Sequence, residues 1–175
     1  MIEAIAISDP ARARFAELLE QHRRMVFKVA NTYARASERE DLAQEIAAQL
    51  WRAYPRYDPA RTFSTWMYRI ALNVAISFLR SDGRHRRHAV PLDEVVHDLA
   101  DDSASDHEAD EQVRLLHRFI ATLEPLNRAL LLLYLDERST REMAEVLGIS
   151  ESNVTTKIGR LKQRLRDHVA PTGNA

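Results

Sequence analysis

Aromatic rings and arginine side chains are concentrated in one short stretch of the sequence. Residues 51–68 contain half of the aromatic residues of the chain, which has 2 Trp, 5 Tyr and 5 Phe. These rings are Trp51, Tyr54, Tyr57, Phe63, Trp66 and Tyr68. A loop with two prolines, residues 55–63, adds Arg56 and Arg61. Rings stack on unpaired bases and guanidinium groups meet phosphates, so the stretch has the chemistry to hold single-stranded nucleic acid. A hydrophobic core is the alternative, and it is the better explanation for Trp51 and Phe63.

The helix that must position these residues follows directly. Apolar periodicity predicts a helix from about Ser64 to Arg80, ended by Ser81-Asp82-Gly83. Its apolar stripe comprises Phe63, Met67, Ile70, Ala71, Val74 and Phe78. Its opposite face comprises Thr65, Arg69, Asn73, Ile76 and Arg80. The Asn73 amide has the donor and acceptor needed to read a base edge; the alternative is an amide that only contacts solvent.

A second candidate site lies near the carboxy-terminal end, in residues 139–168. Ser139 and Glu142 have the spacing of a capping box, which predicts a helix start. Gly148 stands where a left-handed helix stop is needed. Ser150 then caps a new helix, whose apolar stripe is Val154, Ile158, Leu161 and Leu165. A short helix, a tight turn with Gly and a longer helix make a helix-turn-helix, whose second helix enters a major groove.

The second of these helices is basic. From Asn153 to Arg166 it has five basic residues and no acidic one. Its exposed face is predicted to present Ser152, Asn153, Thr155, Thr156, Lys157 and Arg160, with Lys162, Arg164 and Arg166 further on. Such a stripe suits DNA phosphates. The alternative is a helical hairpin with a solvated basic face.

Two further helices are predicted before the aromatic stretch. One runs from about Pro10 to Arg35, and another runs to about Tyr54, with Ser37 as its N-cap and Glu40 completing a capping box. The second helix buries a stripe of leucine and isoleucine. Its other face carries Asp41, Gln44, Glu45 and Gln49.

Composition limits the class of protein. The chain has 175 residues, no Cys and only 4 Gly. Disulfides and thiolate metal sites are therefore excluded, the small number of Gly argues against Gly-rich phosphate loops, and an all-α fold is favoured. The first residues lack the pattern of a secretory signal, and the longest apolar run, residues 129–135, is too short to cross a bilayer. We therefore expect a cytoplasmic protein.

The net charge of −1 conceals a pattern. Residues 1–80 have 12 basic and 9 acidic side chains, and residues 113–175 have 10 and 7, so each segment has a net charge of +3. Residues 81–112 have 3 basic and 10 acidic side chains, a net charge of −7. A self-repelling segment of this kind is typical of a flexible linker. We therefore expect two small helical domains, residues 1–82 and 112–175, joined by an acidic linker over 83–111.

Three segments of the chain resemble the extracytoplasmic-function (ECF) sigma factors, the small two-domain branch of the bacterial sigma-70 family. The segment EDLAQEIAAQLWRAY is similar to the family's polymerase-binding helix, and RTFSTWMYRIALNVAISFLR is similar to its promoter-melting and −10-reading helix. The helix-turn-helix is similar to the domain that reads the −35 element. The resemblance implies a sigma factor, not an enzyme, that binds core polymerase and directs promoter-specific initiation.

The resemblance also assigns the candidate residues. The −10 DNA set is Tyr57, Arg61, Phe63, Ser64, Thr65, Trp66, Arg69, Asn73, Ile76 and Arg80, in which the loop from Tyr57 to Phe63 captures a flipped base. The −35 DNA set is Thr140, Arg141, Ser152, Asn153, Thr155, Thr156, Lys157, Arg160 and Lys162. The polymerase-binding set is Asp41, Gln44, Glu45 and Gln49, because a carboxylate-rich face suits a basic partner.

The chain departs from the family pattern at a few positions. Arg69 and Ile70 stand where primary sigma factors have two adjacent Trp, which implies weaker intrinsic melting and stricter promoter choice. The recognition helix begins Ser152-Asn153-Val154 in place of a Gly-Thr-Val-like run. Gly159 lies inside that helix, where it costs about 1 kcal/mol relative to Ala.

The partners implied by the resemblance are core RNA polymerase, through its clamp helices and flap, promoter DNA and an anti-sigma factor. No cofactor, metal or membrane contact is expected. In the family the linker threads toward the polymerase active site. Its carboxylates here, among them Asp98, Asp101, Asp102 and Asp106, are hypothesised to occupy a cationic channel meant for RNA, or else they are merely solvated.

Two other classes of protein compete with this interpretation. A transcriptional regulator that acts without polymerase would use the same helix-turn-helix, with the amino-terminal half as a sensor or dimer domain. It would bind a DNA site alone, often as a dimer on a palindrome. An enzyme would draw on the single E-x-x-H pattern, Glu94 to His97, a spacing found in di-iron bundles, but no second copy accompanies it.

Overall fold

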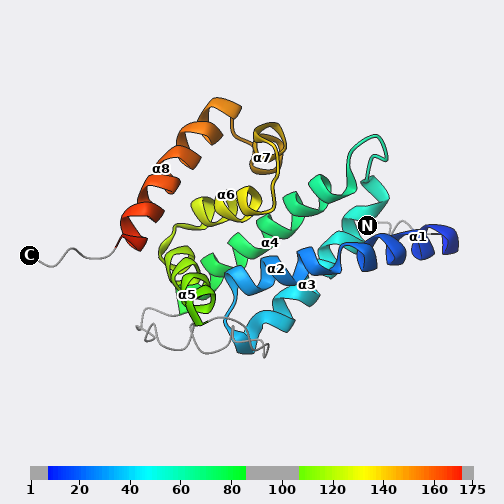
Figure 1. Ribbon diagram of the computed structural model, residues 1–175. Helices are drawn as coiled ribbons and strands as arrows, with labels where there is room; N and C mark the ends of the chain where they lie inside the picture. The colour runs from blue at the N-terminus through cyan, green and yellow to red at the C-terminus, as the bar shows by residue number, and fades with distance from the viewer. Residues whose placement is uncertain (1–7, 86–106, 171–175) are drawn as a thin grey trace, which may run out of the picture. The chain divides into compact units, whose positions relative to one another are not determined.

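The computed structural model describes residues 8–85 and 107–170, and side chains are described within 8–81 and 111–170. In these ranges the chain is helical and contains no strand, so the all-α prediction is confirmed. The chain divides into two compact units, Met1–Arg84 and His85–Ala175 (Figure 1). The predicted domain limits at 82/83 and 111/112 stay a prediction. The acidic residues 93–102 and the Glu94-to-His97 pattern lie outside the described residues.

The first unit contains helices α1 (Asp9–Gln21), α2 (Arg23–Tyr33), α3 (Arg39–Ala53) and α4 (Phe63–His85). Short 3-10 turns, η1 (Ala36–Glu38) and η2 (Tyr54–Arg56), precede and follow α3. Helix α2 packs along α3, and the interior between the helices is apolar. The side chains that are at most 1% exposed in this core are Val29, Ala30, Leu42, Ile46, Leu50, Met67, Tyr68, Ala71, Leu72 and Ala75.

The second unit contains α5 (His107–Thr122), α6 (Pro125–Leu135), α7 (Thr140–Leu147) and α8 (Glu151–Val169). Its core is built around α6, in which five successive residues, 129–133, are buried. From α8 the buried side chains are Val154, Ile158 and Leu161, which confirms three of the four residues of the predicted stripe. Leu165 is half-buried.

The structure corrects the first predicted helix, 10–35, because the chain breaks at His22. This residue has φ −109° and ψ 12°, and α2 starts directly after it. The His22 Nδ1–H donates to the Leu18 carbonyl at 2.8 Å, and the Met25 N–H bonds to the His22 carbonyl three residues back. The ring of His22 lies 5.1 Å from that of Phe63. Apolar periodicity misses the break because the stripe continues across it.

The predicted capping box at Ser37 is wrong. Residues 36–38 form a 3-10 turn, and α3 begins at Arg39 with Glu38 at its N-cap and no side-chain cap bond. The end of α4 was also predicted wrongly, since the helix continues through Ser81-Asp82-Gly83 to His85. The Ser81 hydroxyl donates to the Phe78 carbonyl at 2.8 Å within the helix, and a glycine weakens a helix by only about 1 kcal/mol.

The buried face of α4 also differs from the predicted stripe. Met67 and Ala71 are buried as expected, but Tyr68, Leu72 and Ala75 complete the buried face. The predicted Ile70, Val74 and Phe78 are only half-buried. Thr65, predicted on the polar face, is 7% exposed. The helix is therefore rotated about its axis relative to the prediction. Packing against the rest of the unit, and not the helix's own apolar periodicity, determines which face is buried.

Candidate nucleic-acid interfaces

Helix α4 presents a continuous outward stripe of four predicted DNA-binding residues. Arg69, Asn73, Ile76 and Arg80 are spaced i, i+4, i+7 and i+11, which places them on one face of the helix. Arg69, Asn73 and Arg80 are exposed and Ile76 is half-buried. We call these four residues the α4 stripe. The Asn73 amide has one arginine on each side of it along the helix. This arrangement suits a nucleic-acid strand, which presents both phosphates and base edges.

Aromatic rings cluster at the amino-terminal end of α4. The ring of Tyr57 lies 4.9 Å from that of Trp66 and 5.4 Å from that of Phe63. The ring of Tyr54 lies 6.0 Å from that of Tyr57, with only 17° between the two planes. Of these rings, Phe63 is buried, whereas Tyr54, Tyr57 and Trp66 are half-buried. The cluster is therefore both a small core and an accessible stacking surface.

The loop 57–62, which we call the aromatic loop, is held by its own hydrogen bonds. The Tyr57 hydroxyl donates to the Arg61 carbonyl at 2.7 Å, and the Arg61 N–H bonds to the Asp58 carbonyl at 2.9 Å. The Asp58 carboxylate accepts from the Ala60 N–H at 2.9 Å, as in an Asx turn. Partial burial raises the pKa of the Tyr57 phenol. These three hydrogen bonds stabilise the conformation of the loop.

Three other members of the predicted −10 set are buried in the unit. Phe63, Ser64 and Thr65 are each 7% exposed. They offer little surface to a ligand, and Phe63 instead packs against the rings of Tyr57 and Trp66. Their direct role at DNA stays a prediction.

The helix-turn-helix is formed by α7 and α8, and its predicted caps are confirmed. The Glu142 N–H bonds to Ser139 Oγ at 3.2 Å, and the Ser139 N–H bonds to Glu142 Oε2 at 2.8 Å, so both halves of the capping box are present. Gly148 ends α7 with φ 66° in the left-handed region, where a side chain is strained. Ser150 Oγ accepts from the Asn153 N–H at 3.1 Å and starts α8.

The predicted −35 residues of α8 fall into two rows. Asn153, Lys157 and Arg160 are spaced i, i+4 and i+7 and share one flank of the helix. Lys162 lies on the other flank, with its ammonium 4.5 Å from the centre of the Tyr134 ring. The structure therefore brings Lys157 and Arg160 together and separates Lys162 from them. Asn153, Arg160 and Lys162 are exposed, as are Ser152, Thr155 and Thr156, whereas Lys157 is half-buried. Thr140 and Arg141 begin α7.

Helix α3 carries the predicted polymerase-binding face. Asp41, Gln44 and Glu45 are exposed and Gln49 is half-buried. The Gln49 Nε2 donates to Glu45 Oε1 at 2.7 Å. The opposite face of the helix, with Leu42, Ile46 and Leu50, is buried, so the carboxylates point away from the core.

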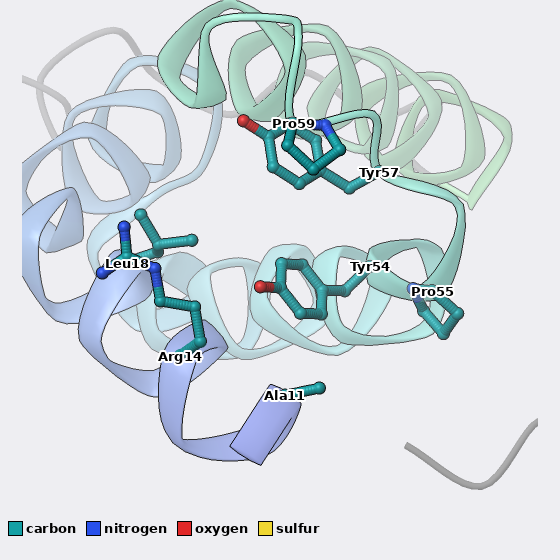
Figure 2. Close-up of a pocket in the computed structure, with 7 residues that line it drawn as sticks. All are labelled: Ala11, Arg14, Leu18, Tyr54, Pro55, Tyr57 and Pro59. Carbon is teal, nitrogen blue, oxygen red and sulfur yellow. The ribbon is translucent and has the colours of Figure 1, made fainter. Parts of the chain in front are cut away.

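The structure also reveals a cleft that the sequence did not predict. It has a volume of about 460 Å³ and lies between α1 and the segment 54–59 (Figure 2). The residues that line it are Ala11, Arg14, Leu18, Tyr54, Pro55, Tyr57 and Pro59. The part from α1 was missed because these residues lie far before the aromatic loop in the sequence, and only folding brings them to it.

The described residues limit other kinds of site. Among the described side chains, those of residues 8–81 and 111–170, no three His, Asp or Glu residues are grouped so as to hold a metal ion. No helix in this part of the chain is long and apolar enough to span a bilayer.

Comparison with known families gives two matches, one in each unit. Residues 18–85 match Sigma-70 region 2, and residues 114–165 match Sigma-70 region 4. The α4 stripe and the aromatic loop lie in the first match, and the helix-turn-helix lies in the second.

Curated relatives narrow the class. The chain is 31% identical over 138 residues to the ECF RNA polymerase sigma factor RpoE of Cereibacter sphaeroides, covering 77% of this chain and 74% of the relative. It is 30% identical over 157 residues to SigE of Mycolicibacterium smegmatis, covering 88% of this chain but only 61% of that longer relative. It is 25% identical to the sigma-E factor of Escherichia coli, covering 98% and 93%.

Two solved structures share the fold. CnrH in complex with the cytosolic domain of CnrY gives a TM-score of 0.63 at 23% identity, covering 89% of this chain and 87% of that one. The sigma factor RpoE in complex with the anti-sigma factor NepR from Bartonella quintana gives 0.71 at 16% identity, covering 91% and 98%.

The two family matches define a protein of the sigma-70 class. The similarity to curated ECF relatives narrows the class further. The chain belongs to the ECF group of RNA polymerase sigma factors. Its function is promoter-specific transcription initiation with RNA polymerase. The resemblance drawn from the sequence is confirmed.

Proposed function

We propose that the first unit opens and holds the −10 element, and that the second docks on duplex DNA at −35. The observation that carries this proposal is the α4 stripe, most of which is exposed. It follows directly in the chain on the aromatic loop, which is held by its own hydrogen bonds. A stacking surface beside a row of two arginines and an amide suits a strand separated from its complement. Extruding a base costs a few kcal/mol, which the rings offset by stacking.

The recognition step at −35 is assigned to the row Asn153, Lys157 and Arg160. An amide followed by two cations on one helix flank combines base-edge reading with phosphate contacts. The left-handed Gly148 and the Ser150 cap support this role, because they end α7 and start α8 and so form the turn between the two helices.

Binding to core polymerase is assigned to the acidic face of α3. The face has two carboxylates that point away from the core, which suits a basic partner surface. The protein would act in the cytoplasm, where polymerase acts. An anti-sigma factor is a further expected partner, since one fold relative was solved with the anti-sigma factor NepR and the other with the cytosolic domain of CnrY.

Run-off transcription over a promoter library tests the proposal. Core polymerase mixed with the chain should yield transcripts from a subset of templates that share −35 and −10 sequences, and core alone should yield none of them. The chain alone should bind those templates weakly. A chain that binds a palindromic site unaided, and gives no transcript with core polymerase, would be a regulator of the other class.

A further inference from the structure

Gly159 lies in the interior of α8, where a glycine costs stability and the fold gives no reason for it. Its φ is not positive, unlike that of Gly148. The residue is exposed, and a Cβ added to it would meet nothing within 4 Å beyond its chain neighbours and the adjacent helix backbone. Glycine weakens a helix interior relative to alanine because it loses more backbone entropy on folding. Neither packing nor backbone conformation within the unit therefore requires a glycine here.

The position of Gly159 around α8 places it on the side that a partner meets first. Arg160, which belongs to the flank assigned to −35 recognition, follows it directly, and Lys162 lies on the other flank. The buried Val154 and Leu161 lie on the opposite side of the helix. Gly159 therefore faces away from the core, between the two flanks.

The helix surface is low at Gly159 and in the turn before it. Ser152, Thr156 and Gly159 are spaced i, i+4 and i+7, share one face and are all exposed. The Thr156 hydroxyl donates to the Ser152 carbonyl at 3.0 Å, so it is turned back onto its own helix. In the following turn the side chains are longer, and Arg166 donates to Gln163 Oε1 at 2.8 Å.

The dimensions of DNA make the height of this surface important. The major groove is about 12 Å wide, and an α-helix with its side chains is about 10–12 Å in diameter, so the fit is close. The side chain that points at the floor of the groove limits how deeply the helix can enter. Where that side chain is absent, the flanking residues reach further toward the base edges.

We propose that Gly159 is the point at which α8 comes closest to the floor of the −35 major groove, and that it determines specificity because a side chain there would hold α8 away from the base edges. This role rests on the −35 docking proposed above for the second unit. It also accounts for the helix stability that the glycine costs, since the glycine is needed only in the DNA complex.

The test uses holoenzyme assembled from core polymerase and the full chain, with a fluorescent duplex that carries the −35 sequence selected from the promoter library. G159A should weaken binding about tenfold, the scale of one base contact, and G159L should weaken it further because its side chain is larger. The slope of log K against log salt should stay unchanged, since Lys157 and Arg160 remain. Affinity for a duplex of unrelated sequence, which depends on phosphates, should change less than twofold.

The stability of α8 provides a second readout, and it should change in the opposite direction. In G159A, hydrogen exchange of the α8 amides should slow about fivefold, the advantage of alanine over glycine within a helix. A purely structural role for Gly159 cannot produce a more stable helix that binds DNA more weakly. The matched control is A121L, which places the side chain of G159L on an exposed residue of α5. This control should bind the −35 duplex within about twofold of the unaltered protein.

Three results would overturn the role of Gly159 while leaving −35 docking intact. One is binding of G159A to the −35 duplex that equals or exceeds that of the unaltered protein. Another is an equal loss in G159A and G159L, which would mark the glycine as a flexible joint. The third is an equal loss on unrelated DNA. An unaltered holoenzyme that does not prefer the −35 duplex to unrelated DNA would instead refute the proposed docking, and the role of Gly159 with it.

Discussion

Asn73 stands at the centre of the α4 stripe, four residues after Arg69 and seven before Arg80. Its side chain is exposed, whereas the preceding residue, Leu72, is buried. An exposed amide contributes little to folding, so its removal separates DNA binding from stability. The same holds for Arg160 on α8, which is exposed as well.

Asn73→Ala should lower the yield of open complexes about tenfold, because a base-edge contact is worth about 1–3 kcal/mol. Permanganate reactivity of the −10 thymines measures the yield. Affinity for core polymerase should stay unchanged, since the acidic face lies on α3. An open-complex yield equal to that of the unaltered protein would remove Asn73 from the −10 surface.

Lys157→Ala and Arg160→Ala should each weaken binding of holoenzyme to −35 DNA and lower the slope of log K against log salt by about one. Each side chain is expected to neutralise one phosphate and release its counterion. Lys162→Ala is the matched control, because Lys162 lies over Tyr134 on the other flank of α8. Fluorescence anisotropy at several salt concentrations gives the slopes. Slopes that fall only in the Lys162 variant would assign the other flank of α8 to DNA.

Among the helices, α7 has the most complete set of local signals. Ser139, Glu142 and Gly148 each make the cap that their residue type predicts. The signals at Ser37 and at residues 81–83 failed, because a 3-10 turn occupies the first and the helix continues through the second. A cap residue stabilises a helix end by about 1 kcal/mol, and packing of the neighbouring helices can contribute more than that.

Ser139→Ala should lower the free energy of unfolding of the second unit by about 1 kcal/mol. The Ser139 backbone N–H, which bonds to the Glu142 carboxylate, holds the pKa of Glu142 below its usual range. A depressed pKa means that the charged form stabilises the fold above the unfolded-state pKa, about 4.3, and that this stability is lost as the pH falls through the lower, folded-state pKa. Thermal unfolding between pH 3 and 7 measures both effects.

The control for this pH dependence is Glu142→Gln. Glutamine can complete a capping box but does not titrate. It should reduce the loss of stability on the acid side while keeping stability at neutral pH close to that of the unaltered protein. An unchanged acid-side slope in Glu142→Gln would show that the acid sensitivity of the domain comes from other carboxylates.

The chain as a whole is organised as two compact units with separate candidate DNA surfaces. Two DNA-binding units that are merely linked to each other gain little cooperativity unless their geometry is fixed, so a larger scaffold is expected to position them. Core polymerase is that scaffold in the proposed function. Binding to it therefore controls both DNA contacts at once.

Reversing the charge at Asp41 and Glu45, as D41K/E45K, should abolish co-purification with core polymerase and with it all promoter-dependent transcription. Both side chains are exposed, so the fold should survive, as circular dichroism can verify. The matched control is E17K/E20K, a double reversal on exposed residues of α1. Retention of D41K/E45K on polymerase would refute the assigned face.

The sequence alone was sufficient for the helical class, the helix-turn-helix and the exposure of Arg69, Asn73 and Arg80 on α4. These features depend on residues close together in the chain, whose hydrogen bonds and apolar periodicity act within one or two helices. Asn73 and Arg160 were predicted as exposed because each lies opposite an apolar stripe.

Three features were decided by tertiary packing alone. They are the break at His22, the rotation of α4 that buries Thr65, and the cleft lined by both Arg14 and Tyr57. Each of these depends on contacts between segments far apart in the sequence, where packing energy exceeds local propensity. A periodic pattern identifies which side of a helix is apolar, but the neighbouring helices determine how far that side turns and which distant residues it meets.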